Sequence, residues 1–72
     1  MNLAAKAIRV NEINKELDRK VAILERHISS LSKRYKDGET DCRLLRDRSV
    51  MIVGCAHIIH DLLKEKEELL RD

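Results

Sequence analysis

The sequence has no proline, no tryptophan and no phenylalanine, and only two glycines and one tyrosine among its 72 residues. Little therefore interrupts a long helix, and an aromatic core cannot form. A chain of this length buries only about 60% of the surface that it exposes when unfolded, so we expect no self-contained enzyme. The residues that are present are 39% charged and 43% hydrophobic. This composition favours long helices or a coiled coil over a sheet protein, a collagen or a disordered tail.

Cysteine is also scarce, because Cys42 and Cys55 can form at most one disulfide, whereas small secreted scaffolds depend on several. The segment that starts at Met1 soon becomes charged and periodic, without the apolar core or the cleavage site of a signal peptide. The longest apolar-rich stretch, residues 50–59, is too short to span a bilayer. We therefore expect a soluble protein of a reducing, cytoplasmic compartment that does not insert into membranes.

One boundary divides the chain, since only residues 36–41 combine a glycine, two aspartates and a threonine between two periodic segments. Gly38 suits the left-handed position that ends a helix, and Thr40 or Asp41 can cap the next helix. The sequence thus predicts one all-α domain over residues 1–72, an antiparallel two-helix hairpin that resembles a coiled coil. Its helices are expected at about residues 3–36 and 41–70, with a turn at about 37–40. The hairpin should self-associate or be completed by a partner chain.

Apolar residues recur every seven residues along the first segment, at two seam positions. One position holds Leu3, Val10, Leu17, Leu24 and Leu31, and the other holds Ala7, Asn14, Val21, Ile28 and Tyr35. Asn14 either fixes the register of the seam or lies in a solvated turn. A stripe of apolar residues also runs along the second segment. The expected hairpin core of both segments is Leu17, Val21, Leu24, Ile28, Leu31, Leu45, Ile52, Ala56, Ile59 and Leu63.

The middle of the second segment, from Met51 to Ala56, is apolar on nearly every face. A two-helix hairpin covers only one of those faces, so another chain must cover the rest. Gly54 allows the backbone of that chain to approach closely. We predict that a partner binds through Leu44, Met51, Val53, Gly54, Ile58 and Leu62. In isolation the same face should drive assembly of a dimer or tetramer.

Charge divides unevenly between the halves. Residues 1–36 carry nine Lys or Arg and four Asp or Glu, whereas residues 37–72 carry six and nine. The two halves therefore attract each other. The basic first helix also suggests an alternative function, a homodimeric four-helix bundle that binds RNA or DNA. We do not favour nucleic acid, because acidic residues intersperse the basic ones and Tyr35 is the only aromatic residue for stacking.

Four residues of the second segment have metal-ligand chemistry, namely Cys55, His57, His60 and Asp61. On a helix, Cys55 and His57 point about 200° apart, so four ligands do not converge from one chain. A metal site shared across a symmetric interface is the only arrangement that stays open. Nucleophilic catalysis needs a third orienting group and an oxyanion loop, for which the sequence offers no candidates. We predict no catalytic residue, no metal site and no cofactor.

The order of these features resembles that of a known family. Leu24 and Leu31 precede the basic run at 33–36, and the Gly38 turn follows. The second helix then carries Ser49, Ala56, Ile58, Ile59, His60 and Leu63. Over roughly residues 17–64 the chain resembles the E-type co-chaperones of the type III secretion needle protein, the YscE-like family.

The resemblance implies an antiparallel helical hairpin in the bacterial cytoplasm. It also implies that the protein binds and stabilises a helical-repeat (TPR-like) chaperone. Together the two proteins would keep the needle subunit monomeric before export, with the needle helix lying in the groove of the chaperone. The long start of the first helix and the charged residues 64–68 depart from the family pattern.

Overall fold

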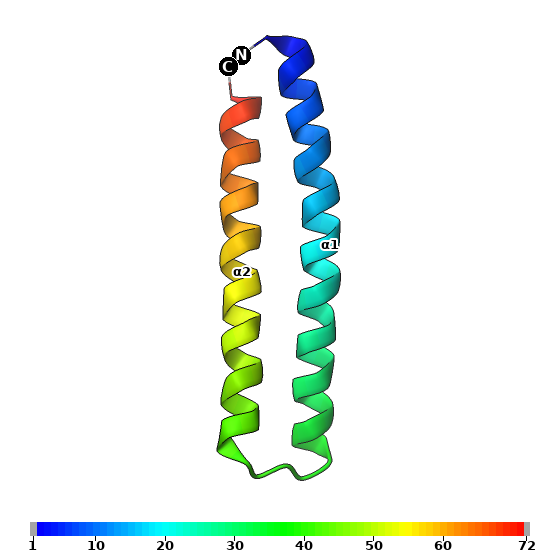
Figure 1. Cartoon of the computed structure of the whole chain (residues 1–72), viewed down its shortest axis with the longest axis vertical. Coiled ribbons are helices and arrows are strands. Elements are labelled where there is room, and N and C mark those ends of the chain that lie inside the picture. Colours follow the sequence, from blue (N-terminus) through cyan, green and yellow to red (C-terminus); the bar gives the residue numbers. More distant parts are fainter. Residues whose placement is uncertain (1, 72) are drawn as a thin grey trace.

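The structure, a computed structural model that describes residues 2–71, consists of two long helices joined by one turn (Figure 1). α1 spans Leu3–Lys36 and α2 spans Cys42–Leu70. The helices run antiparallel, so Leu3 and Leu70 lie at the end of the molecule opposite the turn. The prediction of an all-α helical hairpin is confirmed, and each helix begins and ends within one residue of its expected bounds.

Each helix begins at a side-chain cap. Asn2 Oδ1 accepts the Ala5 N–H at 2.8 Å, and Asp41 Oδ1 accepts the Arg43 N–H at 2.9 Å. Such a cap satisfies a backbone N–H that has no partner within the helix. Of the two caps that the sequence allows for α2, Asp41 is therefore the one used. Its own N–H donates to Glu39 Oε1 at 2.9 Å, which holds the turn against the start of α2.

α1 ends at Gly38, whose φ of +85° is left-handed. The Gly38 N–H donates to the Tyr35 carbonyl at 3.1 Å, and the Glu39 N–H donates to the Arg34 carbonyl at 2.9 Å. These two bonds form a Schellman motif, which satisfies carbonyls that the helix leaves without partners. No other atom lies within 4 Å of the position that a Gly38 Cβ would take. The backbone conformation, rather than lack of space, is thus what requires glycine here.

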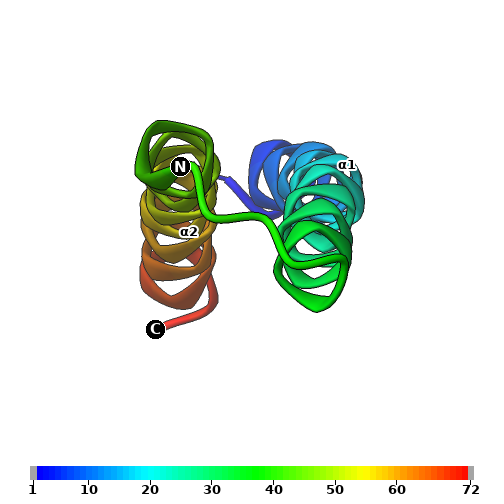
Figure 2. The same ribbon diagram turned by 90° about the horizontal axis from the view of Figure 1, so that it is seen from below.

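The molecule is a thin rod of 53 × 14 × 13 Å. Its radius of gyration is 16.4 Å, whereas a compact domain of this length has about 11 Å. Seen along the rod, the two helices lie side by side in one layer (Figure 2). Among residues 2–71 only Ile13 is fully buried. Neither helix is long and apolar enough, over these same residues, to cross a membrane.

The helices meet along a seam of side chains spaced alternately three and four residues apart, all half-buried except the fully buried Ile13. On α1 the seam contains Val10, Ile13, Leu17, Lys20, Leu24, His27, Leu31 and Arg34. On α2 it contains Leu45, Arg48, Ile52, Cys55, Ile59, Leu62, Lys66 and Leu69. Six residues of the expected core therefore lie in the seam: Leu17, Leu24, Leu31, Leu45, Ile52 and Ile59.

The other four expected core residues, Val21, Ile28, Ala56 and Leu63, are exposed beside the seam. On α1, Lys20 and His27 take the seam positions that the apolar pattern assigned to Val21 and Ile28. A lysine fits there because its aliphatic stem packs while its ammonium group reaches water. This rotation of α1 also satisfies polar groups, since Arg48 Nη1 lies 3.0 Å from His27 Nδ1.

Gly38→Ala is expected to lower the free energy of unfolding by about 1 kcal/mol, because alanine is strained in the left-handed conformation. Chemical denaturation followed by helicity measures this effect. Gly54→Ala is the matched control, since Gly54 lies inside α2 and also has open space at its Cβ position. That variant should instead gain about 0.5–1 kcal/mol. A lower free energy of unfolding in both variants would contradict the conclusion that the left-handed backbone at Gly38 is what requires glycine.

Candidate protein-docking sides

The hairpin has two long sides that flank the seam, and an ion pair between the helices identifies one of them. Arg9 Nε and Nη2 donate to the Glu65 carboxylate at 2.5 and 2.7 Å. Residues at seven-residue intervals from Arg9 and from Glu65 therefore share one side of the hairpin. This Met51 side consists of Arg9, Glu16, Ile23 and Ser30 of α1, and Leu44, Met51, Ile58 and Glu65 of α2. The opposite Ile28 side consists of Ala7, Asn14, Val21, Ile28 and Tyr35 of α1, and Ser49, Ala56, Leu63 and Leu70 of α2.

The Met51 side has an apolar stripe on α2. Leu44, Met51 and Ile58 are 40%, 52% and 43% exposed and follow one another at seven-residue intervals. They extend over roughly 20 Å of helix at ~1.5 Å per residue. α1 adds the half-buried Ile23. An apolar stripe of this spacing is the kind of surface on which a helix of another chain packs.

Charged edges border the Met51 side, and the two helices carry opposite signs. The edge on α1 becomes basic after Glu12, and it continues through Arg19, Arg26 and Lys33. The edge on α2 is acidic, with Asp47, Asp61 and Glu68. Gly54 interrupts the acidic edge between Met51 and Ile58, and apart from its own stretch of α2 nothing lies within 4 Å of its Cβ position. An apolar centre with a charged rim is the usual anatomy of a protein interface.

The Ile28 side draws its apolar residues from both helices. Val21 and Ile28 of α1 are 38% and 48% exposed, and Leu63 of α2 is 50% exposed. Asn14 lies among them, half-buried, and its Oδ1 accepts a hydrogen bond from Lys66 Nζ at 2.7 Å. The edges of this side are acidic on α1 and mixed on α2. They contain Asn11, Asp18, Glu25 and Ser32 of α1, and Arg46, Val53, His60 and Glu67 of α2.

The structure brings together only part of the predicted partner-binding set. Leu44, Met51 and Ile58 share the Met51 side, with Gly54 on its edge. Val53 is 54% exposed but lies on the edge of the Ile28 side. Leu62 was expected on the partner face, whereas it is half-buried in the seam, one heptad after Cys55. Its neighbour Leu63 is exposed instead.

The Arg9–Glu65 pair is the best-defined electrostatic interaction between the helices. Hydrogen bonding to Glu65, and then to Glu12, raises the pKa of Arg9 above its usual range. The same bond from Arg9 lowers the pKa of Glu65. The charge pattern predicts that the basic and acidic halves attract each other, but these two residues can be paired only once the register of the seam is known. The two-pronged geometry orients the helices as well as attracting them.

The described residues present no catalytic constellation. Among residues 2–71, no three His, Cys, Asp or Glu side chains lie close enough to hold a metal ion. Cys42 and Cys55 are free thiols, and His60 pairs only with its neighbour Asp61, at 3.3 Å.

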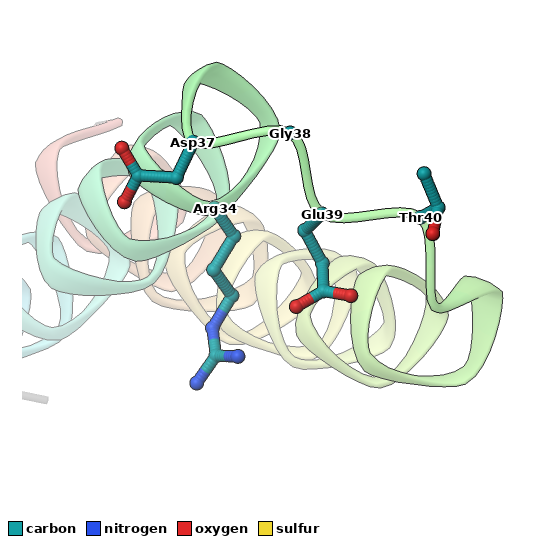
Figure 3. Close-up of a pocket in the computed structure, with 5 residues that line it drawn as sticks. All are labelled: Arg34, Asp37, Gly38, Glu39 and Thr40. Carbon is teal, nitrogen blue, oxygen red and sulfur yellow. The ribbon is translucent and has the colours of Figure 1, made fainter.

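The hollow at the turn is lined mainly by polar groups. Figure 3 shows the Arg34 and Glu39 side chains extending to one side of the loop while Asp37 points away. This surface is open and contains no nucleophile with a positioned base.

The basic side chains of α1 do not form a continuous row of unpaired positive charges. Arg9 is bound by Glu65 and Glu12, and Arg19 lies 3.5 Å from Glu16. Lys20 lies in the seam. A protein that binds along a nucleic-acid backbone needs a continuous positively charged surface. Carboxylates interrupt the basic surface of α1.

Neither a protein-family model, nor a curated protein, nor a solved structure matches this chain. An assignment of function therefore depends on the geometry of the two sides and on the resemblance seen in the sequence.

Glu65→Gln is expected to lower the midpoint of urea unfolding at pH 7. Because Arg9 lowers the pKa of Glu65 from its ordinary 4.5, the ion pair stabilises the hairpin fully above that pH. Its contribution disappears as the pH falls through the lowered pKa, so the two proteins should converge in acid. Glu67→Gln is the control, since Glu67 pairs only within α2, with Arg71. A difference between Glu65→Gln and the unchanged chain that does not shrink as the pH falls below 4.5 would contradict this account.

Proposed function

We propose that the chain is a non-enzymatic docking module whose Met51 side binds a helical surface of another protein. The observation that supports this proposal is the exposed stripe of Leu44, Met51 and Ile58 between two charged edges. At about 25 cal/mol per Å² of apolar area, a few such side chains supply several kcal/mol before association costs are subtracted. The open space at Gly54 would let the backbone of the partner approach the centre of the stripe.

More finely, we propose that the chain is a type III secretion co-chaperone of the bacterial cytoplasm, and that its partner is a TPR-like chaperone. The hairpin architecture over residues 17–64 agrees with the resemblance to the YscE-like family. Helical-repeat proteins offer extended concave surfaces made of stacked helix pairs, onto which a thin rod with one apolar stripe fits well. In this role the chain stabilises the chaperone, which in turn keeps the needle subunit monomeric before export.

Co-expression tests the identity of the partner. The chain is produced with the proteins encoded by its neighbouring genes, among which we expect a helical-repeat protein and a needle-like subunit. Light scattering after size exclusion at moderate salt gives the stoichiometry. We expect co-elution of the three proteins in a fixed ratio. A chain that elutes without these neighbours would overturn the co-chaperone proposal. A complex with nucleic acid that weakens steeply with salt would support the alternative instead.

Met51→Asp is expected to weaken binding of the chaperone at least about 30-fold, because it places a charge at the centre of a desolvated contact. Titration calorimetry with the purified chaperone measures the dissociation constant. Val50→Asp is the matched control, since Val50 is 63% exposed on the outer face of α2, away from the stripe. Equal losses in the two variants, with helicity unchanged, would show that the Met51 side is not the docking surface.

A further inference from the structure

The four residues that the apolar pattern places in the hairpin core, and that the hairpin leaves exposed, all lie on the Ile28 side. They are Val21 and Ile28 of α1 with Ala56 and Leu63 of α2. Apolar residues at seven-residue intervals on a helix are usually buried. These four residues follow that spacing but are not buried within the single hairpin. The repeat therefore describes a core that the hairpin shares with another molecule.

The Ile28 side has a shape that fits a copy of itself. The Arg48–His27 contact at 3.0 Å places residue 48 level with residue 27, and from there the antiparallel helices advance in opposite directions. Four of the five α1 residues on this side, all except Tyr35, thus have a neighbour among the α2 residues of this side at nearly the same level. A large side chain accompanies a smaller one at each level. The neighbours are Ile28 with Ser49, Val21 with Ala56, Asn14 with Leu63, and Ala7 with Leu70.

We propose that a second copy of the chain covers the Ile28 side and forms a four-helix bundle with both turns at the same end. The two-fold axis runs along the rod, so α1 of each copy packs on α2 of the other. Val21 and Ile28 of one copy then meet Ala56 and Ser49 of the other, and large side chains fill the space beside small ones. The Met51 side stays free for a different partner, so this inference goes beyond the proposed function and does not depend on it.

The surface area agrees with such a dimer. The chain exposes 5722 Å², about 1,100 Å² more than the ~4,600 Å² of a typical folded monomer of its mass. A standard interface buries about 800 Å² on each partner. Covering the Ile28 side along the 53 Å rod would thus remove most of the excess.

Charges on the edges of the Ile28 side favour one orientation of the two copies over the other. With both turns at one end, Glu25 on α1 lies within about 6 Å, along the axis, of Arg46 on the other copy. Neither residue joins an ion pair within the part of the chain that the structure describes. With the turns at opposite ends, α1 would pack antiparallel on α1, which brings Asp18 of each copy close to the acidic residues Asp18 and Glu25 of the other. Like charges oppose that second arrangement.

Sedimentation velocity of the chain alone, at tens of micromolar and moderate salt, tests the interface. We expect a dimer that Ile28→Asp converts to a monomer. Ile8→Asp is the control, because Ile8 is 61% exposed on the outer face of α1. A monomeric natural chain, or equal effects of the two variants at unchanged helicity, would overturn the proposal. Both outcomes are independent of whether the Met51 side binds a chaperone.

Complementary charge variants test the pairing between copies. Glu25→Arg and Arg46→Glu should each weaken the dimer on the order of tenfold, because each creates two like-charge contacts. An equal mixture of the two variants should recover the natural affinity as a heterodimer. Arg26→Glu carries the same charge change as Arg46→Glu on the edge of the Met51 side and should have little effect. A mixture that dimerises no more tightly than either variant alone would overturn the pairing.

A distance measurement tests the orientation. Cys42 is exposed at the turn, one heptad before Ser49, and accepts a spin label once Cys55→Ser removes the other thiol. With both turns at one end, the two labels should lie well under half of the 53 Å rod apart. A separation close to the full length of the rod would overturn the same-end arrangement.

Discussion

Two helices can meet along only one line, and this limit shapes the whole molecule. Each helix buries a single stripe, and the seam leaves Ile13 as the one fully buried residue among those described. α2 nevertheless carries apolar residues around its entire middle, from Val50 to Ile59. The surplus lies on two opposite sides of a one-layer rod, where other chains can reach it. Both sides are therefore the places where the proposed partners would contact the hairpin.

Local signals predicted the helices and the turn almost to the residue. Gly38 and Asp41 determine where α1 ends and α2 begins, and both act on the backbone within a few residues. The seam was predicted only in part. Leu17, Leu24 and Leu31 lie in the seam, whereas Leu3 of the same predicted series is exposed. Lys20 and His27 occupy the seam positions predicted for Val21 and Ile28. A seven-residue apolar repeat shows that a residue is to be buried, but it does not show whether its own chain or another one covers it.

Polar pairs across the seam explain why the hairpin adopts this rotation. Arg9 binds Glu65, Arg48 contacts His27, and Lys66 donates to Asn14. Such pairs add modest stability at the surface, but they discriminate strongly between registers, because a rotation of either helix breaks all three. The rotation that satisfies them exposes an apolar stripe of α2 on one side and apolar residues of both helices on the other. The same rotation therefore fixes the register of the two helices and leaves apolar side chains exposed on the outside of the hairpin.

The compact turn also bears on how quickly the hairpin assembles. Because the Schellman motif and the Asp41 cap hold the two helix ends together, the first seam contacts close a short loop at little entropic cost. This favours extension of the seam from the turn toward the open end of the hairpin, where the Arg9–Glu65 pair lies. Fast local closure of this kind is typical of chains with low contact order. The turn is therefore expected to set how quickly the two helices meet.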